Sequence, residues 1–581
     1  MTGALKYSQI VSLNRELGQK LSSRPFKIRV LTNVTVNQLR EILEYSLRSE
    51  GVNATVSIGT YDNILQESRN NAGYDAIIIF WDGWNYVDGL FYRIGNFTAS
   101  EEADLLTKFE LDAAMVLDNL KSTPLVLLNT FTSGMFGYPT PASNAFQRFC
   151  QRADQYLRKD LPTNARILEV CDILQAISVD AAIDWRLFYS AKSPYTIAFF
   201  KEYATLVKAP IRALYGKAKK VLVLDCDNTL WGGIIGEDGL DGVILGSGKP
   251  HGAIYAEIQH IALTLQRRGV LLALCSKNNP EDVDEMLQRH PEMVIKDHHL
   301  AIKRVNWSDK ATNIRAIAEA LNVGLDSLVF VDDSSFEIEL LREQLPEVAT
   351  LLVPSRIVDY PRNFRTISNL FFQLAEAPED RNKTEQYRLE ASRQELRKTY
   401  DNIEDYLRSL SLRITIYADD QKLAARIAQL SQKTNQFNLT TRRYAEQEIT
   451  TLIEATNATV YAFRVSDKFG DYGIAGAAIL RRKDSRTTEI DTFLMSCRVL
   501  GRNVESAFLQ YLLGTLRAEC VETVQSAFIA TAKNGQVASF YDEAGFILTA
   551  SDGGTKNYAF DLLAQALPAG IDYVSITQSD E

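Results

Sequence analysis

Apolar runs of strand length alternate with amphipathic stretches through the first part of the chain. The runs over 27–36, 74–83 and 123–131 predict buried strands, and the pattern over 101–121 predicts a helix between two of them. Strands that alternate with helices are typical of a parallel sheet. We therefore expect a first α/β domain over residues 1–205.

The same alternation returns after residue 205. Four further apolar runs predict strands, and these cover residues 219–226, 269–276, 327–333 and 348–353. Helical stretches separate the runs, so a second α/β domain is expected over 206–375. The segment 376–410 that follows is charged and helical in pattern throughout, which predicts a linker helix.

From residue 411 to residue 581 the pattern becomes mixed. Predicted strands follow one another closely, at 412–418, 459–467, 473–482, 488–496, 523–531 and 557–562. A helical stretch over about 502–519 interrupts them. This arrangement predicts an antiparallel-rich α+β domain, so that the whole chain is expected to be a multidomain α/β protein.

Composition narrows the class of protein. A length of 581 residues is typical of about three domains, and contents of 46% hydrophobic and 23% charged residues are ordinary for a soluble protein. No apolar run approaches the roughly 20 residues of a membrane span, and the first residues do not resemble a secretion signal. Six cysteines without a CxxC motif indicate reduced thiols, so we expect a cytoplasmic location. The net charge of −10 argues against general nucleic-acid binding.

Charged and polar residues stand where the strands of the second domain end. Asp225 and Asp227 follow the first of these strands, Ser276 ends the second, and Asp332 and Asp333 end the third. Ligands of open α/β sheets bind at such strand ends. Carboxylates at this density repel unless a cation neutralises them, and oxygen ligands suit Mg²⁺ bound beside a phosphate. The set predicts phosphoryl transfer, with one Asp as nucleophile and the other as general acid/base.

This ordered set, completed by Lys310 at the start of a predicted helix, resembles the haloacid dehalogenase superfamily. The resemblance implies that Asp225 is the nucleophile and Asp227 the acid/base. It implies that Asp225, the Asp227 backbone carbonyl and Asp333 ligate Mg²⁺, with Asp332 beside them. The remaining residues of the motifs, expected on the substrate side, are Thr229, Ser276, Lys277, Asn278 and Lys310.

Three stretches narrow the resemblance to the FkbH-like family, in subfamily IIIC. They are "DCDNTLWGGIIGEDG" (225–239), "CSKNN" (275–279) and "VNWSDKATNI" (305–314). The layout, with an α/β domain before this unit and an acetyltransferase-like domain after it, is also similar. One departure is "FVDDSSFEIE" (330–339), where the family pattern has Asn and Pro after the two Asps.

The resemblance implies a glyceryl transferase and phosphatase. Its donor would be 1,3-bisphosphoglycerate, and the glyceryl group would pass to an enzyme cysteine and then to the phosphopantetheine thiol of an acyl carrier protein, as in the supply of polyketide building blocks. Two alternatives stay open: a Mg²⁺-dependent phosphatase of small molecules, and a non-catalytic assembly factor that holds a carrier protein.

Cys226 is the leading candidate for the acyl-carrying thiol because it lies between the two Asps. Strand alternation argues the other way, since neighbouring side chains point to opposite faces of a sheet. The competing interpretation is a small buried hydrophobe beneath the site. Cys275 has the same ambiguity, and the other four cysteines are interpreted as core residues.

The third domain resembles the GNAT acyltransferase fold. Arg498, Gly501 and Arg502 precede a predicted helix, where backbone N–H groups can bind a pyrophosphate. Asn534 and Tyr541 are expected to line the same site. The family pattern has a small residue where Asn503 stands, so a carrier-bound phosphopantetheine is preferred to coenzyme A as the ligand. A folding or docking domain without chemistry is the alternative.

The first domain resembles an SGNH hydrolase in outline. Thr32, Asn33 and Thr35 occupy the place of the Gly-Asp-Ser nucleophile turn, and the domain contains no histidine, so a Ser–His pair is impossible within it. We interpret it as a non-hydrolytic recognition or docking domain.

Overall fold

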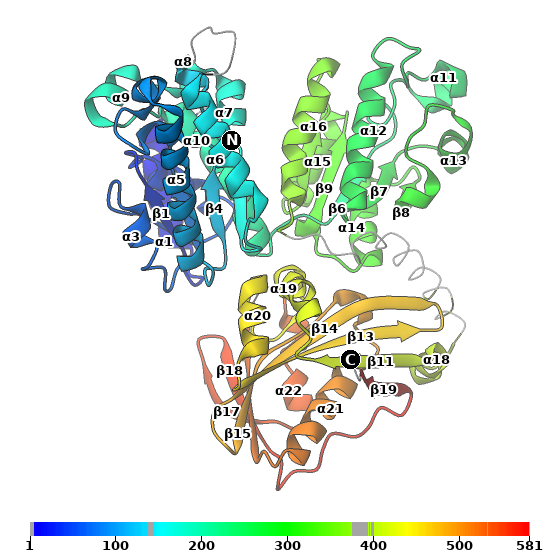
Figure 1. Cartoon of the computed structure of the whole chain (residues 1–581). Helices are drawn as coiled ribbons and strands as arrows, with labels where there is room; N and C mark the ends of the chain where they lie inside the picture. The colour runs from blue at the N-terminus through cyan, green and yellow to red at the C-terminus, as the bar shows by residue number, and fades with distance from the viewer. Residues whose placement is uncertain are drawn as a thin grey trace. The chain divides into compact units, whose positions relative to one another are not determined.

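The computed structural model describes residues 5–136, 144–374, 393, 396, 400–531 and 533–579. The chain divides into two compact units, of which the first contains residues 1–215 together with the short segment 444–448. The second unit contains two separate sheets, each with its own helices (Figure 1). Within the described residues, no helix combines the length and the apolar character that crossing a membrane requires.

The first domain is a parallel sheet of five strands in the order β2-β1-β3-β4-β5. Its strands are β1 (Phe26–Thr32), β2 (Ala54–Ile58), β3 (Ala76–Phe80), β4 (Val126–Asn129) and β5 (Ala165–Leu168). Its helices include α1 (Tyr7–Lys20), α2 (Leu39–Arg48), α3 (Ile64–Glu67), α4 (Leu90–Arg93), α5 (Ala99–Asn119), α6 (Ala145–Lys159), α7 (Val170–Ile177), α8 (Val179–Ala182), α9 (Trp185–Ala191) and α10 (Ile197–Leu214). Every residue of β3 is buried, as in a sheet covered by helices on both faces.

The second domain repeats this architecture with the strand order β10-β9-β6-β7-β8. Its strands are β6 (Val221–Leu224), β7 (Leu271–Ser276), β8 (Leu300–Val305), β9 (Leu328–Asp332) and β10 (Ala349–Leu352). Its helices include α11 (Ile235–Gly242), α12 (Gly252–Arg267), α13 (Pro280–Arg289), α14 (Lys310–Ala320), α15 (Ser335–Gln344) and α16 (Tyr360–Ser368).

Two apolar clusters hold the helices of the second domain against its sheet. One contains Leu222 and Leu224 of β6 with residues of α12, α13 and α16. The other contains Val221 and Val223 with residues of α14 and α15. Because side chains along a strand alternate between faces, the four apolar residues of β6 supply both clusters.

The third domain is built on one large mixed sheet, in the order β17-β18-β16-β15-β14-β13-β11-β19, with β12 paired to β15. Its strands are β11 (Leu412–Ala418), β12 (Phe437–Asn438), β13 (Ala458–Asp467), β14 (Gly470–Arg482), β15 (Thr487–Met495), β16 (Thr523–Ile529), β17 (Ile547–Asp552), β18 (Thr555–Asp561) and β19 (Val574–Gln578). Its helices include α18 (Ile403–Leu410), α19 (Ala424–Lys433), α20 (Glu446–Glu454), α21 (Val504–Ala518) and α22 (Phe540–Glu543).

The predicted fold class, a multidomain α/β chain with two parallel sheets and a final mixed domain, is confirmed. The expected domain limit at residue 205 falls inside α10, which continues to Leu214. The predicted linker helix over 376–410 lies largely outside the described residues, and its last part is α18.

Candidate functional site

The register of the second sheet brings the predicted strand-end residues together. Leu224, the last residue of β6, is paired with Val331 of β9 on one side and with Leu274 of β7 on the other. The Asp225 N–H donates to the Val331 carbonyl at 3.0 Å. Asp225 is therefore level with Asp332, so that the apolar pairing of the strands determines which polar residues meet at the edge.

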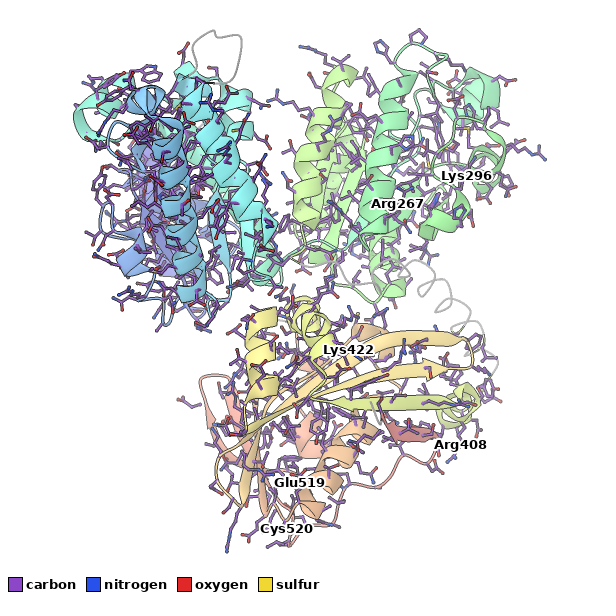
Figure 2. The ribbon with its side chains drawn as sticks, viewed as in Figure 1. Arg267, Lys296, Arg408, Lys422, Glu519 and Cys520 are labelled. Atoms are coloured by element: carbon purple, nitrogen blue, oxygen red, sulfur yellow. The ribbon has the colours of Figure 1, made fainter. Side chains whose placement is uncertain are left out.

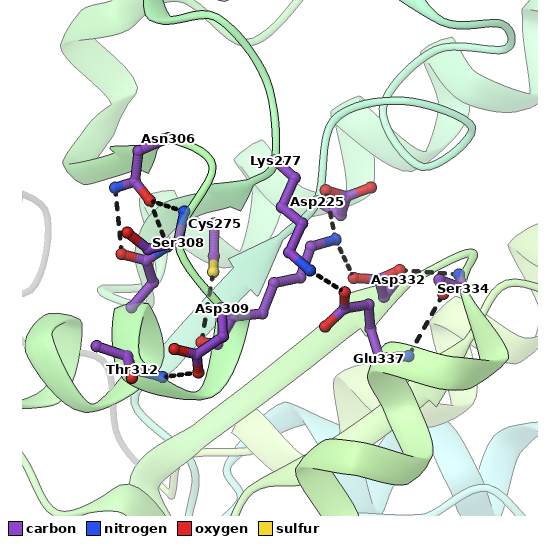
Figure 3. A network of polar contacts seen from close by, with 12 residues as sticks. Asp225, Cys275, Lys277, Asn306, Ser308, Asp309, Thr312, Asp332, Ser334 and Glu337 are labelled. Carbon is purple, nitrogen blue, oxygen red and sulfur yellow. Dashed lines mark hydrogen bonds and ion pairs between the residues drawn. The ribbon is translucent and has the colours of Figure 1, made fainter.

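Three carboxylates gather at this edge. Asp225, Asp332 and Asp333 each offer an oxygen, and these oxygens lie within 4.8 Å of one another. Asp225 and Asp332 are buried, whereas Asp333 is exposed. Lys310, the first residue of α14, donates to Asp225 Oδ1 at 2.9 Å and to Asp332 Oδ2 at 2.5 Å (Figure 3). The predicted lysine and three of the four predicted Asps thus form one cluster.

The protonation of the cluster is set by burial and by its own charges. Burial raises the pKa of Asp225 to about 6 against the opposing effect of Lys310. Burial also raises the pKa of Asp332. Partial loss of hydration, followed by the charge of Asp225, raises the pKa of Asp333, although its side chain still contacts solvent. Burial opposes the charge on Lys310, but the carboxylates of Asp225 and Asp332 outweigh it, so the pKa of this lysine lies above its ordinary value. A lysine that stays charged leaves the ionised cluster with two uncompensated negative charges.

This cluster fits a divalent cation. Two excess negative charges match the charge of one Mg²⁺, and carboxylate oxygens are its preferred ligands. The second oxygen of Asp332 accepts a hydrogen bond from the Ser334 N–H at 2.8 Å, so protein donors already contact both oxygens of this residue. Asp225 and Asp333 are therefore the better placed of the three to hold the ion.

Asp227 lies outside the carboxylate cluster. Its Oδ1 accepts hydrogen bonds from Trp231 Nε1 at 2.9 Å and from the Ile235 N–H at 3.1 Å, and its Oδ2 accepts one from Asn278 Nδ2 at 2.7 Å. Three donors fix the direction of this carboxylate. The arrangement suits a positioned acid/base rather than a side-chain metal ligand, and it leaves the expected backbone carbonyl of Asp227 as its contribution to the metal.

The predicted substrate-side residues take different roles. Ser276 is buried within hydrogen-bonding reach of Asp225, and Asn278 is the partner of Asp227. The hydroxyl oxygen of Thr229 is buried and has no hydrogen-bond partner within the described part of the chain. Lys277 donates instead to Glu337 Oε1 at 2.7 Å, a partner that the sequence analysis did not identify.

Cys226 and Cys275 lie on opposite faces of the sheet. Cys226 is fully buried in the apolar cluster of Leu222 and Leu224, and Cys275 is buried in the cluster of Val223. Burial raises the pKa of the Cys226 thiol well above its usual range and that of Cys275 to about 12. In this conformation burial shields both thiols from solvent and opposes their ionisation, and Cys226 faces away from Asp225 as strand alternation predicts.

The other cysteines are more varied than expected. Cys150 is buried, and Cys171 and Cys497 are half-buried. Cys520 follows α21 and is exposed (Figure 2), so its interpretation as a core residue is wrong. It is the one exposed thiol among the described residues.

At the start of α21, two of the three predicted ligand-binding residues have structural partners. Arg502 is buried, donates to the Arg498 carbonyl at 2.8 Å and lies 4.9 Å from the ring centre of Tyr472. Arg498 Nε donates to Ser496 Oγ at 3.2 Å. Gly501 is exposed and has a φ of +74°, a left-handed conformation that glycine adopts at no steric cost. The exposed backbone at Gly501 therefore remains open to a ligand.

Asn534 and Tyr541 do not line an open site. Asn534 is fully buried, and its amide donates to the carbonyls of Asn438 and Ile529 at 3.1 and 2.9 Å. Tyr541 is buried among aromatic rings, among them Phe546 and Tyr558. Both residues hold the interior of the domain together.

The gap between β15 and β16 is filled by the chain itself. These parallel strands pair only over Thr487–Ile490 and Thr523–Ser526, and beyond this point β12 pairs with β15. The Leu439 N–H donates to Phe493 at 3.1 Å, and the Ile529 N–H donates to Leu439 at 2.8 Å. In this conformation the backbone of β12 and Leu439 therefore occupies the space between β15 and β16.

The end of β1 in the first domain carries neutral polar groups. The amide of Asn33 pairs with the backbone N–H and carbonyl of Asp82, both at 2.8 Å. The hydroxyl of Thr32 donates to the Val34 carbonyl at 2.7 Å. The place of the expected nucleophile turn is thus occupied by a buried network, and Thr35 lies beside it on the chain.

A solved structure with a similar fold supports the arrangement of the first part of the chain. The N-terminal part of the protein BF1531 from Bacteroides fragilis, which contains a phosphatase domain and was solved in complex with Mg, matches with a TM-score of 0.57 and 24% identity. The match covers 64% of this chain and 100% of that one. At this identity the likeness establishes a shared fold, that of a structure with a phosphatase domain.

Two acetyltransferase structures match smaller parts of the chain. A GNAT family acetyltransferase from Elizabethkingia anophelis with acetyl-CoA bound is 14% identical over 20% of this chain and 82% of its own, with a TM-score of 0.16. A putative acetyltransferase of the GNAT family from Desulfovibrio desulfuricans is 14% identical over 26% of this chain and 99% of its own, with a TM-score of 0.21. No protein-family model and no curated protein matches the chain.

Proposed function

We propose that the second domain is a Mg²⁺-dependent phosphatase. The observation that carries this proposal is the group of three carboxylates around one buried lysine, which leaves two negative charges for a divalent ion at the edge of the sheet. The similar fold of a Bacteroides fragilis structure that contains a phosphatase domain and Mg supports it.

The proposed roles are those that the resemblance to the haloacid dehalogenase superfamily implies, and the contacts described above support them. Asp225 Oδ attacks phosphorus, the bond from phosphorus to the ester oxygen breaks, and the leaving oxygen takes a proton from Asp227. Asp227 then removes a proton from water, which attacks the aspartyl phosphate and releases orthophosphate and free Asp225. Trp231 and Asn278 hold Asp227 for both transfers. Asp225, Asp333 and the Asp227 carbonyl would hold Mg²⁺, which neutralises charge on the phosphoryl oxygens when it is bound.

We propose further that the substrate is 1,3-bisphosphoglycerate and that the product is a glyceryl thioester on an acyl carrier protein. An enzyme thiolate attacks the acyl carbon, the bond to the acyl phosphate breaks, and orthophosphate leaves. The carrier's phosphopantetheine thiolate then attacks the thioester, and the enzyme thiolate leaves. The phosphatase site removes the second phosphate. This finer proposal rests on the resemblance to the FkbH-like family.

The buried state of Cys226 favours the simpler alternative, a phosphatase of small molecules. Acyl transfer through Cys226 requires that the thiol become exposed and ionised, and both burial and Asp225 oppose this ionisation. The variants Cys226→Ala and Cys520→Ala test which thiol carries the acyl group. The covalent acyl-enzyme should be lost only in the variant that lacks the acyl-carrying cysteine.

The test uses the full chain with 1,3-bisphosphoglycerate, Mg²⁺ and a carrier protein that bears phosphopantetheine. We expect orthophosphate release, and intact-mass spectrometry of the carrier to show a glyceryl adduct that is absent from a carrier without phosphopantetheine. If orthophosphate is released faster than the uncatalysed rate but no adduct forms, the phosphatase proposal is supported and the transferase proposal is contradicted. If neither orthophosphate nor the glyceryl adduct forms, both the phosphatase and the transferase are overturned, and the assembly factor is favoured.

For the third domain we propose carrier docking in place of chemistry on coenzyme A. The filled gap between β15 and β16 opposes binding of an extended thiol arm, while the exposed backbone at Gly501 remains available. Calorimetry with coenzyme A is expected to show no binding to the full chain. Binding in the micromolar range would contradict this assignment.

A further inference from the structure

Lys277 is a second lysine at the carboxyl edge of the second sheet, next to the phosphatase site. It follows Ser276, the last residue of β7, and its side chain is 36% exposed. Lys310, by contrast, is 5% exposed, and its ammonium contacts two of the three carboxylates. Of the two, only Lys277 is accessible to a group that arrives from solvent.

Lys277 is held by a carboxylate that has little other support. Glu337, in the first turn of α15, accepts from Lys277 Nζ at 2.7 Å through Oε1, and its side chain is 8% exposed. Its Oε2 is buried without a hydrogen-bond partner in the described part of the chain. A buried carboxylate is costly unless it is paired, so Glu337 holds the ammonium firmly in place.

The position of this pair is tied to the carboxylate cluster. Asp332 Oδ1 accepts from the Ser334 N–H at 2.8 Å, and Ser334 Oγ accepts from the Glu337 N–H at 3.3 Å. Figure 3 shows the resulting path from Asp332 through Ser334 and Glu337 to Lys277. The same turn that presents Asp332 and Asp333 therefore also orients Glu337, which in turn places Lys277 beside the site.

An ammonium has three N–H donors, and within the described residues the contacts of Lys277 use one of them. The acidic cluster nearby would repel a second anion unless a cation receives it. We propose that Lys277, positioned by Glu337, binds a second anionic group of the substrate, and that it selects phosphate esters that carry a carboxylate or an acyl phosphate a few bonds from the ester phosphate. This inference rests on the proposed phosphatase function and specifies its substrate class.

Two compounds of similar size test the inference. In 3-phosphoglycerate a carboxylate takes the place of the second hydroxymethyl group of glycerol 3-phosphate. With the full chain and saturating Mg²⁺, we expect a kcat/KM at least about 10-fold higher for 3-phosphoglycerate. Lys277→Met should abolish this preference, mainly by raising KM for 3-phosphoglycerate more than KM for glycerol 3-phosphate.

Further variants separate a positioning role from a structural one. Glu337→Gln should weaken the preference by a smaller factor than Lys277→Met, and Lys277→Arg should restore part of it. Since Lys277→Met leaves Glu337 buried without its partner, the double variant Lys277→Gln/Glu337→Gln repeats the test with a neutral pair. Lys303→Met, which breaks a lysine–carboxylate pair on β8 outside the site, is the matched control and should keep the preference.

Equal losses for both compounds in Lys277→Met and in the double variant would overturn the inference, as would a wild-type enzyme that does not distinguish them. A wild-type enzyme that hydrolyses neither compound nor 1,3-bisphosphoglycerate would overturn the proposed phosphatase together with it.

Discussion

The first and second domains are built on similar sheets but carry different chemistry at their strand ends. Both sheets have five parallel strands. In the first domain, the residues at these ends are mostly amides and hydroxyls, such as Asn33, Thr32 and Asn129, which bond within the protein. In the second domain they are carboxylates and lysines. The architecture supplies an edge, and only the residues placed on it decide whether that edge can bind an ion.

The strand-end edge of each of the two sheets also contains a buried aspartate with a raised pKa. Burial raises the pKa of Asp82 to about 6, as it does for Asp225. The neighbours differ: Asp82 accepts from the neutral hydroxyl of Tyr195, whereas Asp225 faces Lys310 and two further carboxylates. A raised pKa alone therefore does not identify a catalytic group. The charged groups around Asp225 are what distinguish it from Asp82.

The largest effect is expected from removal of the nucleophile. Asp225→Asn should lower phosphate release at least about 1,000-fold, because an amide oxygen does not form the covalent intermediate. The matched change in the other domain, Asp82→Asn, should leave the activity within about twofold of wild type. Steady-state rates on 3-phosphoglycerate compare the two, and similar losses in both would remove the distinction between the domains.

Loss of Lys310 should destabilise the second domain in the absence of metal. Lys310→Met leaves two buried carboxylates without their partner, which is expected to cost about 3–5 kcal/mol of unfolding free energy in EDTA. Added Mg²⁺ should recover part of this loss because it replaces the missing charge. Hydrogen exchange of the β6 amides with and without Mg²⁺ measures both quantities. If Lys310→Met is as stable as wild type in EDTA, the ion pairs of Lys310 with Asp225 and Asp332 contribute nothing to the unfolding free energy.

Asp82 should make the first domain less stable as the pH rises. The unfolded chain loses this proton near the ordinary pKa of 3.8 and the folded chain near 6, so the folded state holds more protons between these values. Stability therefore falls as the pH rises from 4 to above 6, by about 3 kcal/mol for a fully buried group. Hydrogen exchange of β3 amides should show a steeper fall in wild type than in Asp82→Asn, which retains the contribution of Asp154, a second carboxyl group whose pKa burial raises to about 6. A parallel pH dependence in both proteins would contradict the assignment.

Asp333 should affect metal affinity with little effect on the fold. Asp333→Asn is expected to raise the Mg²⁺ concentration for half-maximal activity at least about 10-fold, the scale that changes around metal ligands typically reach. Because Asp333 is exposed, stability without metal should stay within about 0.5 kcal/mol of wild type. Glu285→Gln removes one charge from the exposed side of α13 and is the control. An unchanged Mg²⁺ requirement in Asp333→Asn would exclude this residue as a ligand.

The interior strands of the two parallel sheets were predictable from the sequence, whereas most edge strands were not. The runs of β3, β6 and β7 are apolar because helices cover both faces. The sequence analysis missed β2, β5 and β8, and each lies at the edge of its sheet. In β8 the sequence LAIKRV carries two cations, and only its first residue is buried. An edge strand whose side chains are partly exposed to solvent lacks the continuous apolar run by which a buried strand is predicted.

The site was predictable where it follows from strand ends and was not where it depends on loops. Asp225, Ser276 and Asp332 meet because paired parallel strands end together. The contact of Trp231 with Asp227 depends on the tight turn after β6, in which Asn228 has a φ of +52°. Glu337 reaches Lys277 from the first turn of α15, sixty positions away. Neither contact follows from spacing along the chain.

The covalent intermediate tests the central claim most directly. Wild-type protein with Mg²⁺ and ³²P-labelled 3-phosphoglycerate, quenched in acid and digested, should yield one labelled peptide with the phosphate on Asp225. A phosphate found on another residue, or steady turnover without any labelled peptide, would contradict the account of this edge as an aspartate-based phosphatase site.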